Sequence, residues 1–383
     1  MELASNMSIL PGTDWNFTNQ TIDIIHPIQD IDLDIKEQRI IIYPKGASIF
    51  AAICAVLFII FGILGNLLTI LALCRCAKLR NATTAFVVSL CTADLLFCTF
   101  NLPLTASRYI HQSWLLGETM CTLFPFFFYG NVAVSLMSMT AITINRYILI
   151  NHYRIYDRIY RRRNITLMIA FCWLFSFSML LPTLTKTWGQ FGLHEETFSC
   201  TILKLDGKSP KKFLFVFGFL LPCIVIILSY SCIFYKVRQT RKNIAAHSPT
   251  TPTQAPLCHQ VSQRADEIRL TKLMMIVFFS FLICFLPLMI VNVFDSKFRI
   301  PVIHVLASIL AWMSSCINPI IYAVLNRQYR QAYVRLFCPR ERNTSTVSRS
   351  GSGSAYSKTL VSDVFIYHPA SNKMEKKQAE DKI

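Results

Sequence analysis

One arginine stands at the end of a long apolar segment, in the sequence Asn145-Arg146-Tyr147. An arginine at the centre of a membrane helix costs roughly 2.5–3.5 kcal/mol, so this one must lie at a membrane boundary and have a partner. Glu267 precedes another apolar segment and would be that partner if the inner ends of the two helices meet. An exposed ion pair contributes only about 0–1 kcal/mol. The pair would therefore act as a weak latch.

A carboxylate, Asp94, falls inside another apolar segment. An acid in lipid is expensive, and the default interpretation is a functional group that faces polar neighbours, water or an ion. Asn131 and Ser135 are four residues apart and share one face of a helix. If that face meets Asp94, the three residues line a small polar chamber. The alternative is a protonated Asp94 held by a hydrogen bond.

These residues require a set of membrane helices to position them. Apolar residues make up 53% of the 383 residues and charged residues 15%, in blocks of the roughly 20 residues that span a bilayer core. The blocks lack the alternating pattern of a transmembrane barrel. The sequence thus predicts an all-α bundle of seven helices within residues 48–325. The expected spans are 48–74, 82–104, 119–150, 165–185, 211–236, 267–294 and 301–325.

Lysine and arginine crowd every second connection between the spans, most densely after the third span, where Arg154, Arg158 and Arg161 lie. By the positive-inside rule these connections are cytoplasmic and the amino terminus is extracellular. The net charge of +17 therefore reflects topology, and we expect membrane lipids as partners and no nucleic acid. Residues 1–47 form an extracellular tail, whose glycosylation sequons are at Asn6, Asn16 and Asn19.

Two cysteines lie on the side that this topology makes extracellular. Cys121 begins the third span at its outer end, and Cys200 lies in the connection before the fifth span. The extracellular side is oxidising, so the sequence predicts a disulfide bond between them.

Pro222, Pro287 and Pro319 fall within the fifth, sixth and seventh spans and predict helix irregularities there. Beyond the seventh span, residues 326–338 read as an amphipathic helix on the inner surface, and Cys338 at its end is placed for palmitoylation. We expect residues 339–383 to form a disordered cytoplasmic tail. The connection 237–266 is rich in Pro, Thr and Gln and reads as a linker.

Three other classes of membrane protein fit the pattern poorly. An odd number of spans without an internal repeat argues against an inverted-repeat transporter. A single chain supplies no ring of pore residues for a channel. Asp94 is the one acid clearly inside a span, and no hydrolase or metalloprotease motif appears, so we expect no enzyme. Kinked helices around a weak latch instead indicate a bundle with two states.

The ordered set of motifs resembles one known family. The motifs, one per span, are Gly65-Asn66, Leu90 with Asp94, Cys121 with Arg146, Trp173, Pro222 with Tyr230, Cys284-Phe285-Leu286-Pro287 and Asn318-Pro319-Ile320-Ile321-Tyr322. The chain resembles the class A (rhodopsin-like) G-protein-coupled receptors over roughly residues 48–338. Asn145 in place of the usual aspartate, with Tyr153 and Tyr156 downstream, is similar to the melatonin-like branch. That branch includes the insect Moody and Trapped-in-endoderm receptors, which the chain resembles most.

The resemblance implies roles for these residues. Arg146 would contact a G protein when the receptor is active and pair with Glu267 when it is inactive. Tyr230 and Tyr322 would then move inward to meet Arg146, and Tyr147 completes the motif. Asp94, Asn131, Ser135, Ser315 and Asn318 would match the family's allosteric sodium pocket, with no other cofactor expected. Phe285 stands where most members have a toggle tryptophan, with the packing switch Phe281 one turn below.

Two departures from the family pattern matter. Asn145 cannot form the usual salt bridge within the helix, so we expect a less firmly held resting state. Phe285 puts the usual toggle mechanism in doubt. The implied partners are a heterotrimeric G protein, arrestin and a receptor kinase at the plasma membrane, with cell migration or barrier signalling as the setting. The alternative is a non-signalling scavenger or adhesion protein of the same fold.

The expected ligand pocket is aromatic, with Phe128 at the depth where amine receptors place an aspartate. Basic residues surround its rim, namely Arg108, Lys204, Lys208, Lys211 and Lys212. The pattern favours a lipid-like or amphiphilic ligand with an acidic head, although lysines that only hydrate the loop explain it as well. The candidate ligand residues are Arg108, Phe128, Tyr129, Val132, Phe217, Asn292, His304 and Trp312.

Overall fold

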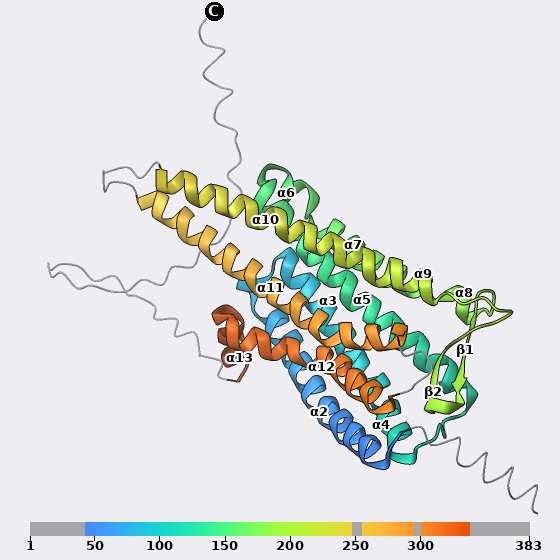
Figure 1. Ribbon diagram of the computed structural model, residues 1–383. Coiled ribbons are helices and arrows are strands. Elements are labelled where there is room, and N and C mark those ends of the chain that lie inside the picture. The colour runs from blue at the N-terminus through green and yellow to red at the C-terminus, as the bar shows by residue number, and fades with distance from the viewer. Residues whose placement is uncertain (1–42, 247–254, 295–299, 338–383) are drawn as a thin grey trace, which may run out of the picture. The chain divides into compact units, whose positions relative to one another are not determined.

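The computed structural model describes residues 43–246, 255–294 and 300–337, which belong to one compact unit of the chain. Almost all of the secondary structure in this part is helical (Figure 1). The α-helices are α2 (Lys45–Arg75), α3 (Ala82–Leu96), α4 (Leu102–His111), α5 (Gly117–Asn151), α6 (Tyr153–Ile159), α7 (Arg162–Ser178), α8 (Leu181–Leu184), α9 (Lys211–Phe215), α10 (Leu221–Ala246), α11 (Ala255–Phe294), α12 (Pro301–Leu325) and α13 (Arg327–Phe337).

Seven helical segments in the described part of the chain are long and apolar enough to cross a membrane. Helices α2, α5, α11 and α12 each supply one of them, and the others combine consecutive helices: α3 with α4, α7 with α8, and α9 with α10. The prediction of an all-α bundle with seven spans is therefore confirmed. The seventh helix, Pro301–Leu325, has the expected bounds.

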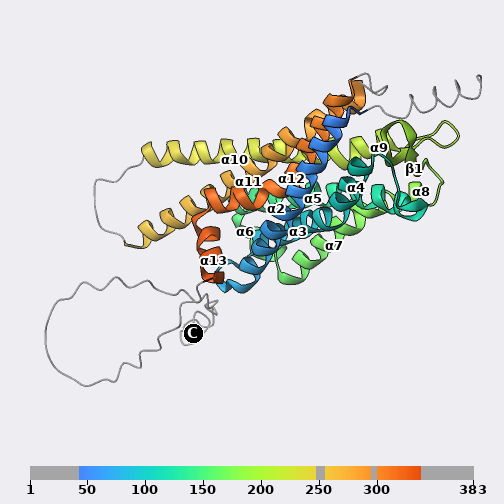
Figure 2. The ribbon, with the colours of Figure 1, turned by 90° about the horizontal axis from the view of Figure 1, so that it is seen from below.

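Helix α5 lies at the centre of the packing. It contacts α3, α7, α10 and α11, and its outer end meets the only strands in the described residues (Figure 2). Helix α2 packs against α3, α4 and α12 instead. This arrangement puts the residues of α5 next to those of four other spans, so α5 can carry contacts for both ends of the bundle.

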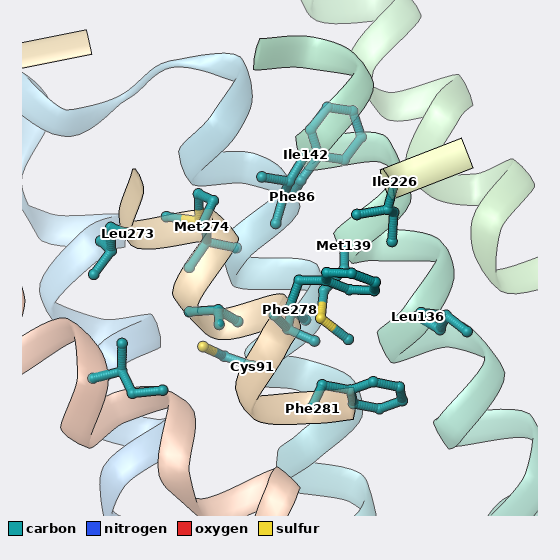
Figure 3. Packing of buried hydrophobic residues seen from close by; sticks show 14 of the residues in the cluster. Phe86, Cys91, Leu136, Met139, Ile142, Ile226, Leu273, Met274, Phe278 and Phe281 are labelled. Carbon is teal, nitrogen blue, oxygen red and sulfur yellow. The ribbon is translucent and has the colours of Figure 1, made fainter. Parts of the chain in front are cut away.

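The largest cluster of buried apolar side chains joins α3, α5, α10, α11 and α12, and Figure 3 shows part of it from close by. Phe86 of α3, Ile142 of α5, Ile226 of α10 and Phe278 of α11 are each at most 2% exposed. A bilayer provides little hydrophobic drive between helices, so close packing of these side chains has to hold the helices together. The third span is thus packed against the second, fifth and sixth spans.

Two wide π-helical turns interrupt the spans, η2 (Phe97–Asn101) and η4 (Val216–Leu220). Each is followed directly by a leucine and a proline, Pro103 and Pro222. Proline has no N–H to donate to the carbonyl one turn earlier. A π turn reassigns the bonds around that gap, and the N–H of Leu221 donates to the carbonyl of Val216. The irregularity expected at Pro222 therefore takes the form of a wide turn just before it.

A two-stranded antiparallel hairpin, which the sequence analysis did not predict, lies between the fourth and fifth spans. Its strands are β1 (Gln190–His194) and β2 (Ser199–Leu203), joined by the short 3-10 turn η3 (Glu195–Thr197). Cys200 of β2 is bonded to Cys121 at the outer end of α5, with 5.1 Å between the Cα atoms. The predicted disulfide is thus confirmed, and it fixes the hairpin to the third span.

The fifth and sixth spans extend further than the sequence suggested. Helix α10 continues to Ala246 and α11 begins at Ala255, although residues 237–266 read as a linker. Glutamine, arginine, lysine and alanine in these extensions are good helix formers, so both helices continue beyond their apolar parts. At the inner surface, α13 follows the seventh span, as expected for residues 326–338.

Candidate functional site

The guanidinium of Arg146 lies near the inner end of α5 and is only 1% exposed. It donates hydrogen bonds to the carboxylate of Glu267 on α11 and to the hydroxyl of Thr83 on α3. The pair with Glu267 is the one ion pair found among the residues that the structure describes. Because the side chain of Glu267 is 45% exposed, water competes for this carboxylate. The arrangement is a weak link between the third and sixth spans, as the sequence suggested.

Asn145 and Thr83 complete this network. The Thr83 hydroxyl donates to Oδ1 of Asn145 over 2.7 Å, and Nδ2 of Asn145 donates to the hydroxyl of Tyr156 over 3.1 Å. One hydroxyl can donate once and accept twice, so Thr83 serves Asn145 and Arg146 together. Asn145 is neutral and thus orders Arg146 through Thr83, without a salt bridge within α5.

Two tyrosines of the connection after the third span cover Asn145. Their rings, from Tyr156 in α6 and Tyr160 just after it, lie 4.8 Å apart. Burial raises the pKa of Tyr156, and burial together with the neighbouring Tyr156 raises the pKa of Tyr160 to about 12. Both hydroxyls therefore stay protonated near neutral pH. They remain able to exchange hydrogen bonds with Asn145.

The carboxylate of Asp94 meets the expected residues in the middle of the bundle. Ser135 donates to Oδ1 of Asp94 over 3.1 Å, and Asn318 donates to Oδ2 over 2.8 Å. Ser315 lies beside the same small cavity, of about 10 Å³. Asn131 also lines it, although its amide donates to Asn101 and not to Asp94, over 3.4 Å. The structure thus brings together all five residues of the predicted pocket.

These residues suit a small hard cation. Oδ1 of Asn131 is buried and has no hydrogen-bond partner among the described residues, which leaves an acceptor beside the carboxylate. Within the same residues, no group of three or more His, Cys, Asp or Glu is placed to hold a metal ion. A cation here would depend on one carboxylate and neutral oxygens, a donor set that oxygen-preferring ions accept.

Aromatic side chains connect this pocket to the rest of the bundle. Phe281 and Phe285 of α11 stack with ring centroids 4.6 Å apart, and both line the small cavity. Towards the inner end, Tyr230 is 8% exposed and Tyr322 is fully buried. The hydroxyl of Tyr322 has no hydrogen-bond partner among the described residues. It is therefore available for a partner in another arrangement of the helices.

Tyr147, Pro287 and Pro319 lie outside the hydrogen-bond networks of Arg146 and Asp94. The hydroxyl of Tyr147 lies 3.4 Å from Nε2 of His152, away from the Arg146 network. Pro287 and Pro319 lie inside helices that continue past them. The Pro319 ring packs close to Gly65, where a β-carbon would come within 3.0 Å of it. That contact joins the first and seventh spans.

A large cavity of about 640 Å³ opens at the outer end of the bundle. Its deep wall is apolar and includes Phe128, Val132 and Phe285. Val132 and Phe285 also line the small cavity beside Asp94. The two cavities therefore share a wall. An occupant of the outer cavity would contact the same side chains that line the polar site.

Most candidate ligand residues line this outer cavity. They are Arg108, Phe128, Tyr129, Val132, His304 and Trp312, joined by Lys211 and Lys212. Lys204 and Lys208 lie outside its lining. Phe217 does not meet the expectation, since its side chain is 43% exposed and packs on Phe213. The wide turn η4 changes the rotation of the residues before Pro222, so Phe215 and Phe219 line the cavity instead.

Several predicted positions lie outside the described residues. These are the sequons at Asn6, Asn16 and Asn19, the palmitoylation site Cys338 and the side chain of Asn292. They stay predictions from the sequence.

The chain belongs to the family described as 7 transmembrane receptor (rhodopsin family), which it matches over residues 65–322. It is a G-protein-coupled receptor and a multi-pass protein of the plasma membrane, and the extracellular amino terminus inferred from charge agrees with this topology.

Its relatives include insect and vertebrate receptors. Protein trapped in endoderm-1 of Drosophila melanogaster is 49% identical over 326 residues, which cover 81% of this chain and 83% of that protein. G-protein coupled receptor moody of the same species is 38% identical over 77% of this chain, which spans about half (52%) of that longer protein. Human melatonin receptor type 1B is 33% identical over 76% of this chain and 80% of its own. These matches confirm the resemblance to the melatonin-like branch.

The structure itself resembles squid rhodopsin, with a TM-score of 0.69 over 77% of this chain and 86% of that one. The two sequences are 24% identical, so this likeness concerns the fold.

Two features of the site could not be predicted from the sequence. Thr83 did not stand out, because a threonine in an apolar helix usually bonds its own backbone, as Thr92 does with the carbonyl of Val88. The hairpin also supplies Thr197, whose carbonyl accepts from Arg108. The only sequence signal for the hairpin was Cys200, which predicted a bridge and not a pair of strands.

Proposed function

We propose that this receptor binds a lipid-like or amphiphilic extracellular ligand with an acidic head and in response activates a heterotrimeric G protein. The single observation that carries the ligand class is the outer cavity. Its lining includes the cations Arg108, Lys211 and Lys212 and, among the described residues, no aspartate or glutamate. Below them the wall is mainly aromatic and aliphatic, which suits an apolar tail.

The ligand would act on the inner end through the shared wall of the two cavities. An occupant that contacts Phe285 also bears on the packing of Phe281 and on the residues around Asp94. A ligand shifts a conformational equilibrium only as far as it prefers one state. We propose that it prefers the state in which the inner ends separate and the Arg146–Glu267 pair breaks.

The G protein would favour the same open state from the inside. Arg146, freed from Glu267, would contact the G protein, and Tyr230 and Tyr322 would turn towards Arg146. Because ligand and G protein prefer one state, each raises the affinity of the other by the same factor. The protein thus acts as a receptor and not as an enzyme.

Further partners belong to the same proposal. Asp94, with Ser135, Asn131, Ser315 and Asn318, would hold a sodium ion that favours the resting state. Arrestin and a receptor kinase would act on the cytoplasmic side after activation. The proposed biological setting is cell migration or barrier signalling, the setting expected for the insect members of this branch.

The test uses the full-length receptor in nanodiscs with purified G-protein heterotrimers and a panel of amphiphiles that share one tail. Acidic amphiphiles should accelerate nucleotide exchange more than neutral ones of the same chain length. Binding of the amphiphile without any acceleration for any G protein would contradict the proposal. It would favour the non-signalling scavenger instead.

A further inference from the structure

Arg108 is an unusually placed cation. It lies in the last turn of α4, lines the outer cavity and is only 9% exposed. A buried guanidinium normally needs an acid beside it, because removing the charge from water is costly. Among the described residues, the hydrogen bonds of Arg108 go only to neutral acceptors, namely the carbonyl of Thr197 at 3.3 Å and the hydroxyl of Tyr109 at 3.2 Å.

Aromatic rings hold this cation in place. The Cζ atom of Arg108 lies 4.5 Å from the ring centre of Tyr109, which packs in turn against Trp312 at 5.7 Å and Tyr43 at 6.0 Å. The face of an aromatic ring attracts a cation without neutralising it. Arg108 is therefore fixed in position before any ligand arrives, and it still carries its full charge.

One edge of the guanidinium is unused. A guanidinium has five N–H donors, and the two bonds described above use one hydrogen on each terminal nitrogen. The remaining nitrogen, Nε, is buried and has no hydrogen-bond partner in the described part of the chain. Nε and the adjacent terminal nitrogen form a parallel pair of donors, whose geometry matches the two oxygens of a carboxylate or a phosphate.

The lysines of the cavity are less suited to this task. Lys211 and Lys212 are exposed on α9, so solvent screens an ion pair with either of them and the pair would contribute little. Arg108 has already lost its water. An oxyanion that reaches it therefore gains a stronger and more directional contact.

We infer that Arg108 determines the ligand specificity of this receptor by binding an oxyanion, a carboxylate or a phosphate, side-on through its Nε edge. The inference rests on the proposed function, because it assigns the headgroup contact within the same cavity. With the head at Arg108, the apolar tail extends along the wall of Phe128 and Val132 towards Phe285.

The experiment measures saturation binding of three tritiated probes to the full-length receptor in nanodiscs. Oleic acid, oleyl phosphate and oleyl alcohol share one tail and differ in the head. The variants are Arg108→Gln, which removes the charge, and Arg108→Lys, which keeps the charge but lacks the parallel donors. Lys208→Gln, at an exposed residue outside the cavity lining, is the matched control, and Lys211→Gln and Lys212→Gln remove the other two cations of the cavity.

The wild type should bind at least one of the acids more tightly than the alcohol. Arg108→Gln should weaken binding of the preferred acid by about 30-fold or more, as expected when a buried charge pair loses one partner, and leave alcohol binding unchanged. The affinity of Arg108→Lys for the preferred acid should lie between those of the wild type and of Arg108→Gln. Lys211→Gln and Lys212→Gln should weaken acid binding by about fivefold at most, and Lys208→Gln should leave it unchanged. A preference for oleyl phosphate over oleic acid identifies a phosphate head, and the reverse identifies a carboxylate.

Other outcomes separate this inference from the proposed function. If the acids are preferred and Arg108→Gln keeps that preference, the inference is overturned and the ligand class stands. If the wild type binds acid and alcohol equally, the acidic head is rejected as well, and if it binds no probe the amphiphile is rejected. Binding of oleyl alcohol by Arg108→Gln shows that this variant is folded. If Arg108→Gln binds none of the probes, the same comparison of acid and alcohol binding is made with Arg108→Lys.

Discussion

Thr83 and Asn145 share a hydrogen bond at the inner end of the bundle, in which Oγ1 of Thr83 donates to Oδ1 of Asn145 over 2.7 Å. The same oxygen accepts a hydrogen bond from Arg146. A neutral amide at position 145 offers Arg146 no charge, so within the described residues its side chain is held by one hydroxyl and one half-exposed carboxylate. We therefore expect the resting state of this receptor to depend on Thr83.

Replacement of this hydroxyl tests that dependence. Thr83→Val keeps the shape of the side chain but removes an acceptor for Arg146 and a donor for Asn145. Because hydrogen bonds to charged groups are the stronger ones, ligand-independent nucleotide exchange should rise about threefold to tenfold. Thr92→Val is the matched control, since among the described residues Thr92 donates to the carbonyl of Val88 on its own helix and to no other group. Equal exchange by the two variants would rule out a role for Thr83 in the resting state.

The link to the sixth span makes a second prediction. Glu267→Gln retains the size of the side chain and removes its charge, which weakens the contact with Arg146. Since half-exposed ion pairs contribute about 0–1 kcal/mol, ligand-independent exchange should rise by about fivefold at most. Glu118→Gln, at the exposed outer end of α5, is the control for charge removal. A lower rate in Glu267→Gln than in the control would show that the pair does not favour the resting state.

The packing of the first span can be tested through Gly62. A β-carbon at residue 62 would lie 2.3 Å from the sulfur of Cys98 and 3.0 Å from that of Cys316. Gly62→Ala should therefore lower the free energy of unfolding by about 1–3 kcal/mol, the usual cost of overpacking. Gly46→Ala, which meets nothing within 4 Å, should be neutral. Thermal unfolding measures both, and Cys98→Ala should restore part of the loss in Gly62→Ala. An unchanged melting temperature would refute the close contact.

Sodium should stabilise the receptor through Asp94. In NaCl the melting temperature should exceed that in KCl at equal ionic strength, by up to the equivalent of about 1.4 kcal/mol at ten times the dissociation constant. Asp94→Asn removes the charge while keeping the side chain's shape, and should abolish this difference. Asp157→Asn, exposed on α6, should preserve it. A sodium effect that survives in Asp94→Asn would move the ion elsewhere.

The sequence predicted the contacts of charged side chains that lie in or beside apolar segments, because such side chains need a polar partner. Arg146 and Glu267 flank apolar segments, so each needed a partner, and the structure pairs them. Asp94 likewise lies against Ser135 and Asn318. A group that is expensive in lipid has few places to lie, and this restricts the prediction strongly.

The sequence did not predict contacts of side chains that have another bonding partner of similar free energy. The hydroxyl of Thr83 could have bonded its own helix, as Thr92 and Thr140 do, so its sequence context gives no signal. The position of Phe217 depends on the wide turn before Pro222, and a proline alone does not tell whether a helix kinks or widens. The hairpin strands are only five residues each, so the alternation of polar and apolar residues within them is too short to predict a pair of strands.

The role of Arg146 is tested most sharply by the rate of nucleotide exchange on a purified G protein in the Glu267→Gln background, where we expect the inner end to open most readily. Adding Arg146→Ala should reduce the rate to that of empty nanodiscs. Adding Arg75→Ala, at the exposed inner end of α2, should leave it unchanged. Exchange at the full rate without Arg146 would contradict the claim that this guanidinium carries the signal to the G protein.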